Sequence, residues 1–201
     1  MSSRDSGKER KTIEYYDQVS ASWAPQHTTA RYWGSLDTFF NSLPEGKVLE
    51  IGCGGARDAK DYLIDRYDYV GTDASQGMLD EAKKVVPQGV FIHQSFYELD
   101  FPEDSFDGFW ASASLLHIPK TRIDEVLQLI STVVKPGGIG FISMKQGVGE
   151  EEDEDARWFA YYSQDEFKEI LERNKFEVME TTMKPTEGKT TWMLFVVRSE
   201  K

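Results

Sequence analysis

The sequence predicts an α/β fold: a doubly wound, seven-stranded sheet that is parallel except at a C-terminal hairpin and is covered by helices on both faces. Three observations support this. Short β-rich runs alternate with amphipathic segments from residue 47 to residue 173, which is the order that builds parallel sheets. The run 139–144 is apolar nearly throughout, as in a strand covered on both faces. The last two β-rich runs are joined by a short turn, which makes an antiparallel hairpin.

The segment before the first strand divides into a tail and a helical lid. Residues 1–11 are polar and are expected to be disordered. Apolar residues between Thr12 and Trp23 follow helical spacing, and a second, aromatic-rich helix is expected over 31–42. We therefore assign residues 12–43 to an N-terminal helical lid and residues 44–201 to a single α/β domain.

The elements of the α/β domain follow in a regular order. Strands are expected over 47–51, 67–73, 90–92, 106–111 and 139–144, with the hairpin over 176–183 and 190–198. Helices are expected from about residue 56, over 76–86, over 123–134 and over 163–173. Ser75 is a candidate N-cap, and Ser163 with Glu166 forms a capping box. The Gly- and Glu-rich residues 146–155 are expected to form a loop.

Composition limits the partners and the compartment. The 201 residues carry a formal net charge of −12, which repels polyphosphates and makes nucleic acid an unlikely partner. The one cysteine excludes an internal disulfide. There is no apolar run long enough to span a membrane and no signal-peptide core. A cytoplasmic protein without a membrane partner is expected, and the oligomeric state is not indicated.

Two elements at the ends of neighbouring predicted strands indicate a nucleoside ligand. Gly52-Cys53-Gly54 follows the first strand, and glycines there allow positive φ and a close approach of the backbone. Glu50 lies just before this turn and can bind a cationic or hydrogen-donating group. Asp73 ends the second strand, where a carboxylate can accept both hydroxyls of a ribose. Each element alone is common in ordinary turns and caps, but the two together favour a nucleoside.

The choice of nucleoside depends on charge and size. A dinucleotide fingerprint requires a small residue three positions after its second glycine, whereas this chain has Arg57 there. Glu50 is also poorly suited to a pyrophosphate, but it suits the positively charged aminoacyl end of S-adenosylmethionine. Charge therefore favours S-adenosylmethionine over a nicotinamide cofactor.

Four segments, in order, resemble the motifs of class I S-adenosylmethionine-dependent methyltransferases. Val-Leu-Glu-Ile-Gly-Cys-Gly-Gly-Ala-Arg-Asp-Ala at 48–59 is similar to their first motif, and Gly-Thr-Asp-Ala-Ser-Gln-Gly-Met-Leu at 71–79 to their second. Residues 101–107 with 114–119 resemble the fourth-strand region, and 135–138 the turn before the fifth strand. Ala56 stands where the family usually has a third glycine, a mild change if its φ is helical. The resemblance implies a Rossmann-like fold in a small, stand-alone methyltransferase.

The resemblance also implies which residues contact S-adenosylmethionine and its product S-adenosylhomocysteine. Glu50 would face the methionine ammonium and Asp73 the ribose, while Gln94 and the Ser95-Phe96 backbone would bind the adenine amine. Tyr16 belongs either to a lid over the cofactor or to helix packing. The implied cofactor contacts are Tyr16, Glu50, Gly52, Cys53, Gly54, Asp73, Ala74, Met78, Gln94, Ser95, Phe96 and Ala111.

The acceptor is less defined than the donor. His117 follows the fourth strand and is a candidate general base, since its ordinary pKa suits proton removal near neutrality; the alternative is a structural histidine. Cys53 has no basic partner in sequence, so a nucleophilic role is not favoured. No His or Cys spacing indicates a metal.

Several functions stay open. A small-molecule acceptor is expected, and the alternatives are an RNA- or protein-modifying methyltransferase, a non-catalytic cofactor-binding module and a nicotinamide dehydrogenase. The acidic segment 149–155, followed by aromatic residues, is expected to be a solvated loop. Its functional alternative is an acidic, aromatic mouth that selects a cationic or aromatic molecule.

Overall fold

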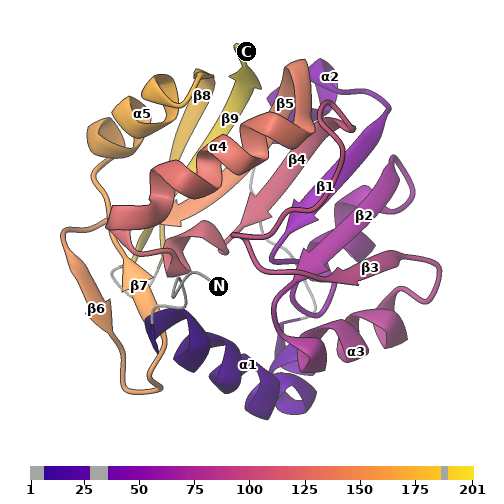
Figure 1. Cartoon of the computed structure of the whole chain (residues 1–201), viewed down its shortest axis with the longest axis vertical. Helices are drawn as coiled ribbons and strands as arrows, with labels where there is room; N and C mark the ends of the chain where they lie inside the picture. Colours follow the sequence, from indigo (N-terminus) through magenta and orange to yellow (C-terminus); the bar gives the residue numbers. More distant parts are fainter. Residues whose placement is uncertain (1–6, 28–35, 187–189) are drawn as a thin grey trace.

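The computed structural model describes residues 7–27, 36–186 and 190–201. Seven strands form one sheet in the order β3-β2-β1-β4-β5-β9-β8 (Figure 1). Neighbours among the first five strands are parallel, while β9 runs antiparallel to both β5 and β8. The predicted fold class and the terminal hairpin are therefore confirmed. The strands are β1 Lys47–Ile51, β2 Asp68–Asp73, β3 Val90–His93, β4 Phe106–Ser112, β5 Val134–Lys145, β8 Phe176–Pro185 and β9 Thr191–Ser199.

Helices cover both faces of the sheet. One face packs against α4 (Ile123–Val133) and α5 (Gln164–Arg173), and the other against α2 (Asp37–Ser42), a short π-helix (Ala59–Leu63) and α3 (Gln76–Val85). Alternate residues of each central strand serve opposite faces: in β1, Leu49 packs toward α4 and Val48 toward α2. Each such buried side chain stabilises the fold by roughly 1.5–3 kcal/mol.

Helix α1 (Gly7–Gln26) begins five residues earlier than expected. Residues 7–11, expected to be disordered from their polarity, are held by side chains from a distant part of the chain. The Lys8 ammonium lies 3.4 Å from the centre of the Trp158 ring, and Lys11 pairs with Glu152 at 2.8 Å. The composition of residues 7–11 alone does not predict these contacts, because their partners lie far away in the sequence. Residues 1–6 and 28–35, which include the start of the predicted second helix, lie outside the described residues.

The acidic segment is a hairpin rather than a loop. Its strands are β6 (Glu150–Glu152) and β7 (Trp158–Ala160), paired antiparallel. The turn is stabilised by Arg157, whose guanidinium donates to both Asp153, at 2.6 and 2.9 Å, and Asp155, at 3.4 Å. This neutralisation explains why a run rich in like charges folds back on itself. Figure 1 shows the hairpin next to the N-terminal end of α1, and α1 in turn lies beside α3.

Candidate functional site

A cavity of about 1030 Å³ opens where the parallel strands end, beneath α1. Its size is at the upper end of small-molecule sites, roughly 300–1,000 Å³, so it has room for a nucleoside and a second small molecule. Ten of the predicted site residues line it, while Gln94, Ser95 and Ala111 do not. Those that line the cavity are Tyr16, Glu50, Gly52, Cys53, Gly54, Asp73, Ala74, Met78, Phe96 and His117.

The three predicted residues outside the lining have identifiable surroundings. Ala111 is fully buried, and the next two residues of the chain face the cavity instead. Ser95 donates its hydroxyl to Glu9 of α1 at 2.5 Å. The Gln94 side-chain oxygen is buried and has no hydrogen-bond partner among the described residues, so it is still able to accept from a donor.

The glycine turn after β1 has the predicted backbone. Gly52 and Gly54 have φ of +70° and +51°. A Cβ on Gly52 would lie 2.5 Å from the Cβ of Ser114, whereas one on Gly54 would meet nothing within 4 Å. Gly52 is therefore required by space as well as by φ, and Gly54 lets the backbone border the cavity. Ala56 has φ of +61°, so the expectation that alanine is mild there fails, because its condition of a helical φ is not met.

The Asp73 carboxylate is fixed at the end of β2 by two hydrogen bonds and can accept more. Its Oδ2 accepts from the Gly54 amide and its Oδ1 from the Ser75 amide, each at 2.8 Å. A carboxylate has about four lone-pair positions, so each oxygen can accept one more hydrogen bond. Burial raises the pKa of Asp73.

Glu50 is a buried carboxyl at the end of β1 that borders the same cavity. The Tyr69 hydroxyl donates to it at 2.5 Å. Burial first, and the nearby Asp58 carboxylate second, raise the pKa of Glu50 well above its ordinary value. Asp58 is itself bound by the Trp110 indole at 2.9 Å and by Arg57 at 2.7 Å. Glu50 thus lies where a cationic group would favour its ionised form.

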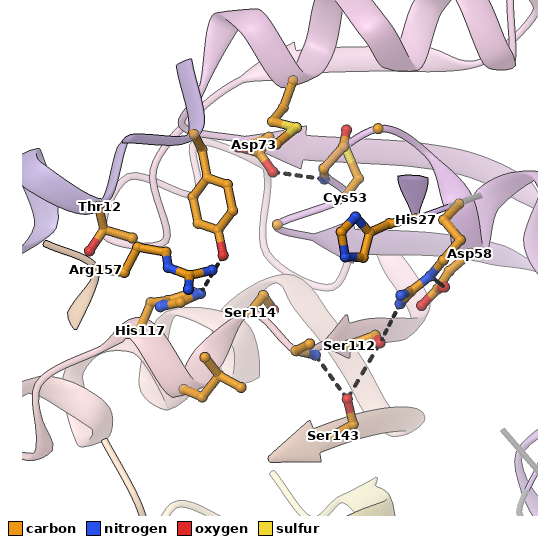
Figure 2. A pocket seen from close by; sticks show the side chains of 18 of the residues that line it. Thr12, His27, Cys53, Asp58, Asp73, Ser112, Ser114, His117, Ser143 and Arg157 are labelled. Carbon is orange, nitrogen blue, oxygen red and sulfur yellow. Dashed lines mark hydrogen bonds and ion pairs between the residues drawn. The ribbon is translucent and has the colours of Figure 1, made fainter. Parts of the chain in front are cut away.

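His117 lies between α1 and the hairpin. Its Nδ1 is 2.7 Å from the Trp158 carbonyl and its Nε2 is 3.1 Å from the Tyr16 hydroxyl. Because a carbonyl only accepts, Nδ1 carries the proton and Nε2 accepts from Tyr16. Burial lowers the pKa of His117 to about 4, so the imidazole is neutral near pH 7 but is a weak base. Figure 2 shows it beside Arg157, at the opposite end of the cavity from Asp58.

Sequence reasoning missed the basic part of the lining. Lys145, Arg157 and Lys184 border the cavity, whereas the acidic residues 150–155 do not. A signal for Lys145 was present, because strand periodicity places it on the same face of β5 as Ser143, another lining residue. Arg157 and Lys184 had no such signal. Arg157 reaches the cavity only through the unpredicted hairpin.

Two further findings concern the described part of the chain. No three or more His, Cys, Asp or Glu side chains there are grouped so that they could hold a metal ion. Among residues 7–27, 36–186 and 190–201, every helix is too short or too polar to cross a membrane.

Residues 48–138 match the family model of the methyltransferase domain. A methyltransferase of Synechocystis sp. is 32% identical over 96 residues, covering 48% of this chain and 45% of that protein. The demethylmenaquinone methyltransferase of Lysinibacillus sphaericus is 36% identical over 106 residues, covering 48% and 43%. The chain thus spans less than half the length of these two relatives.

Solved structures share the fold over most of the chain. The 1,6-didemethyltoxoflavin-N1-methyltransferase of Burkholderia thailandensis, solved with its acceptor and S-adenosylhomocysteine, has a TM-score of 0.76 at 18% identity, covering 100% of this chain and 93% of that one. The [4+2]-cyclase SpnF has a TM-score of 0.75 at 16% identity, covering 96% of each. At these identities the likeness concerns the fold alone.

The sheet order, the glycine turn and the two strand-end carboxylates define an α/β protein with a cavity where its parallel strands end. The match over 48–138 makes the comparison more specific: this part of the chain is similar to methyltransferase domains.

Proposed function

We propose that this chain transfers a methyl group from S-adenosylmethionine to a small-molecule acceptor. The main observation behind this proposal is that Glu50 and Asp73 lie at the ends of neighbouring parallel strands. Both border one cavity, together with the glycine turn. The volume of the cavity and its cover, α1, support a small acceptor. The demethylmenaquinone and didemethyltoxoflavin methyltransferases named above also act on small molecules.

The residues present fit the cofactor. The unused lone pairs of Asp73 would accept the two ribose hydroxyls, and the buried Glu50 carboxylate would bind the methionine ammonium. The orphaned Gln94 oxygen is a candidate acceptor for the adenine amine. When bound, S-adenosylmethionine supplies an electrophilic methyl group on a sulfonium sulfur. The protein then contributes mainly by positioning the acceptor against that group and excluding water.

The role of His117 stays a prediction. Its low pKa and its two engaged nitrogens favour a positioning role, in which it holds the Tyr16 hydroxyl over the cavity. A general base is required only if the acceptor is bound in a protonated form.

Calorimetry with S-adenosylmethionine and with NAD tests the proposal. We expect S-adenosylmethionine and S-adenosylhomocysteine to bind and NAD not to bind. Asp73→Ala should weaken S-adenosylmethionine binding by at least about tenfold, since two charge-assisted hydrogen bonds are lost. Unaltered affinity in that variant would contradict the ribose assignment, and binding of NAD alone would contradict the proposed function.

A further inference from the structure

Three side chains form a row across the antiparallel side of the sheet. Trp192 of β9 is paired in register with Lys145 of β5 on one side and with Lys184 of β8 on the other. Residues directly opposite one another on adjacent strands project from the same face, and all three border the cavity. A tryptophan with a lysine on each neighbouring strand therefore lines the part of the cavity formed by β5 and the C-terminal hairpin.

Neither lysine has an ion pair or side-chain hydrogen bond within the described residues. The Lys145 ammonium instead lies over aromatic rings, 4.0 Å from the centre of Phe159 and 5.8 Å from that of Trp192. Its side chain is partly buried. Burial lowers the pKa of Lys145, and the Arg157 charge lowers it further.

The two carboxylates whose charges act on Lys145 already have other hydrogen-bond partners. Asp153 and Glu151 favour its charged form, but Asp153 is bound to Arg157 and Glu151 accepts the Tyr161 hydroxyl at 2.7 Å. Neither of them lines the cavity. The cavity is consequently polarised, with carboxyl groups at the ends of β1 and β2 and, at the ends of β5 and β8, two lysines that have no ion pair among the described residues.

We infer that the acceptor is a planar, acidic small molecule bound as its anion, with Lys145 and Lys184 as counter-ions and the Trp192 and Phe159 rings as its apolar contacts. The inference rests on the proposed function and names its acceptor class. It replaces the idea of an acidic mouth for a cationic acceptor, because the cavity lining at this end is basic. A conjugated carboxylate, enolate or phenolate has the required chemistry: a flat apolar body and a localised negative charge.

Three probes of matched shape test the inference: 2-naphthoate, neutral 2-naphthamide and cationic 2-naphthylmethylammonium. Each is titrated into the full chain by calorimetry, with and without saturating S-adenosylhomocysteine. We expect 2-naphthoate to bind about tenfold more tightly than the amide, and the cation to bind most weakly. Lys145→Met keeps the apolar stem and should remove most of this preference, Lys145→Arg should retain it, and Lys145→Met with Lys184→Met should abolish it.

Lys168→Met is the matched control, since Lys168 lies on α5 outside the cavity and should leave all affinities unchanged. Circular dichroism establishes that each variant is folded. The inference is overturned if the three probes bind alike, if the cation binds best, or if no probe binds up to its solubility limit. It is also overturned if Lys145→Met and the double variant with Lys184→Met both keep the preference for the anion.

One competing role for Lys145 is to bind the carboxylate of the cofactor. S-adenosylhomocysteine affinity in Lys145→Met separates the two: unchanged affinity supports the inference, and a tenfold or greater loss overturns it. Should the wild-type chain bind no S-adenosylhomocysteine, the proposed function fails, while the titrations without it still decide whether Lys145 selects an anion.

Discussion

At the scale of single residues, the main feature of this site is its buried charged groups. Glu50 and Asp73 are buried carboxyl groups whose pKa values are raised by desolvation. The pKa of Lys145 is lowered mainly by the same cause. In each case burial disfavours the charged form, so a ligand of opposite charge gains more here than it would at the surface. Without a ligand, these buried charged groups therefore destabilise the folded protein.

Glu50→Gln should show this cost directly. Because the folded-state pKa of Glu50 is raised, the folded protein binds more protons than the unfolded chain above pH 4.5. Stability therefore falls as pH rises from there through the raised pKa, by up to about 1.4 kcal/mol per pH unit. The glutamine variant should lack this fall and melt at a higher temperature than wild type at neutral pH.

The same variant should bind S-adenosylmethionine at least about tenfold more weakly, because the ammonium loses its counter-charge. Thermal melts across this pH range and calorimetry provide the two measurements. Glu14→Gln, at an exposed position of α1, is the control for removing a carboxylate. Equal melting curves for Glu50→Gln and wild type at all pH values would contradict the buried-charge argument.

Residue identity predicted the positions of Glu50, Asp73 and the glycine turn better than the surroundings of His117. Glu50, Asp73 and the glycines lie at strand ends, so local pattern was enough to place them. The state of His117 depended on Tyr16 and Trp158, which are 101 and 41 residues away. No local pattern reports such partners, and a low pKa could not be anticipated from sequence.

At the scale of elements, α1 is tied to the cofactor side of the cavity through α3. Asp17 accepts the Ser75 hydroxyl at 2.7 Å and the Gly77 amide at 2.9 Å. The Ser75 hydroxyl in turn accepts from the Met78 amide at 3.1 Å, which confirms Ser75 as the N-cap of α3. A negative side chain near a helix N-terminus is stabilising, so one residue couples the covering helix to a helix whose first turn lines the cavity.

Asp17→Ala should weaken this attachment. Two hydrogen bonds to a charged acceptor are lost, and we expect release of S-adenosylhomocysteine to accelerate roughly tenfold. Stopped-flow displacement measures the rate. Glu14→Ala removes an exposed carboxylate from the same helix and should leave the rate unchanged. If the two variants release ligand at the same rate, α1 does not hold the cofactor through Asp17.

Most elements were predicted to within a few residues where their pattern is local. Strand β1, the Ser163 capping box and the terminal hairpin are examples. Strand β5, however, begins at Val134 rather than at residue 139 and so includes the expected turn over 135–138. Two features were missed because tertiary contacts outweigh composition. The start of α1 is held by Trp158 and Glu152, and the acidic hairpin by the pairing of Arg157 with Asp153.

At the scale of the whole molecule, shape and net charge determine which acceptors the proposed methyl transfer could use. The chain carries a net charge of −12, whereas Lys145 and Lys184 border an internal cavity. A polyphosphate would have to approach a repulsive exterior. A small anion experiences mainly the local field of Lys145 and Lys184 once it has entered beneath α1.

We therefore expect labelled methyl groups to appear in small molecules and not in macromolecules. The protein would be incubated with S-adenosylmethionine labelled at its methyl group, and separately with a low-molecular-weight metabolite fraction, total RNA and total protein. Label should enter only the metabolite fraction. If the anionic atom itself is methylated, the labelled product should bind less tightly to an anion-exchange column than the unmethylated acceptor does. Asp73→Ala is the background control. Label in RNA or protein above that background would show that the acceptor is a macromolecule and would contradict the proposed small-molecule acceptor.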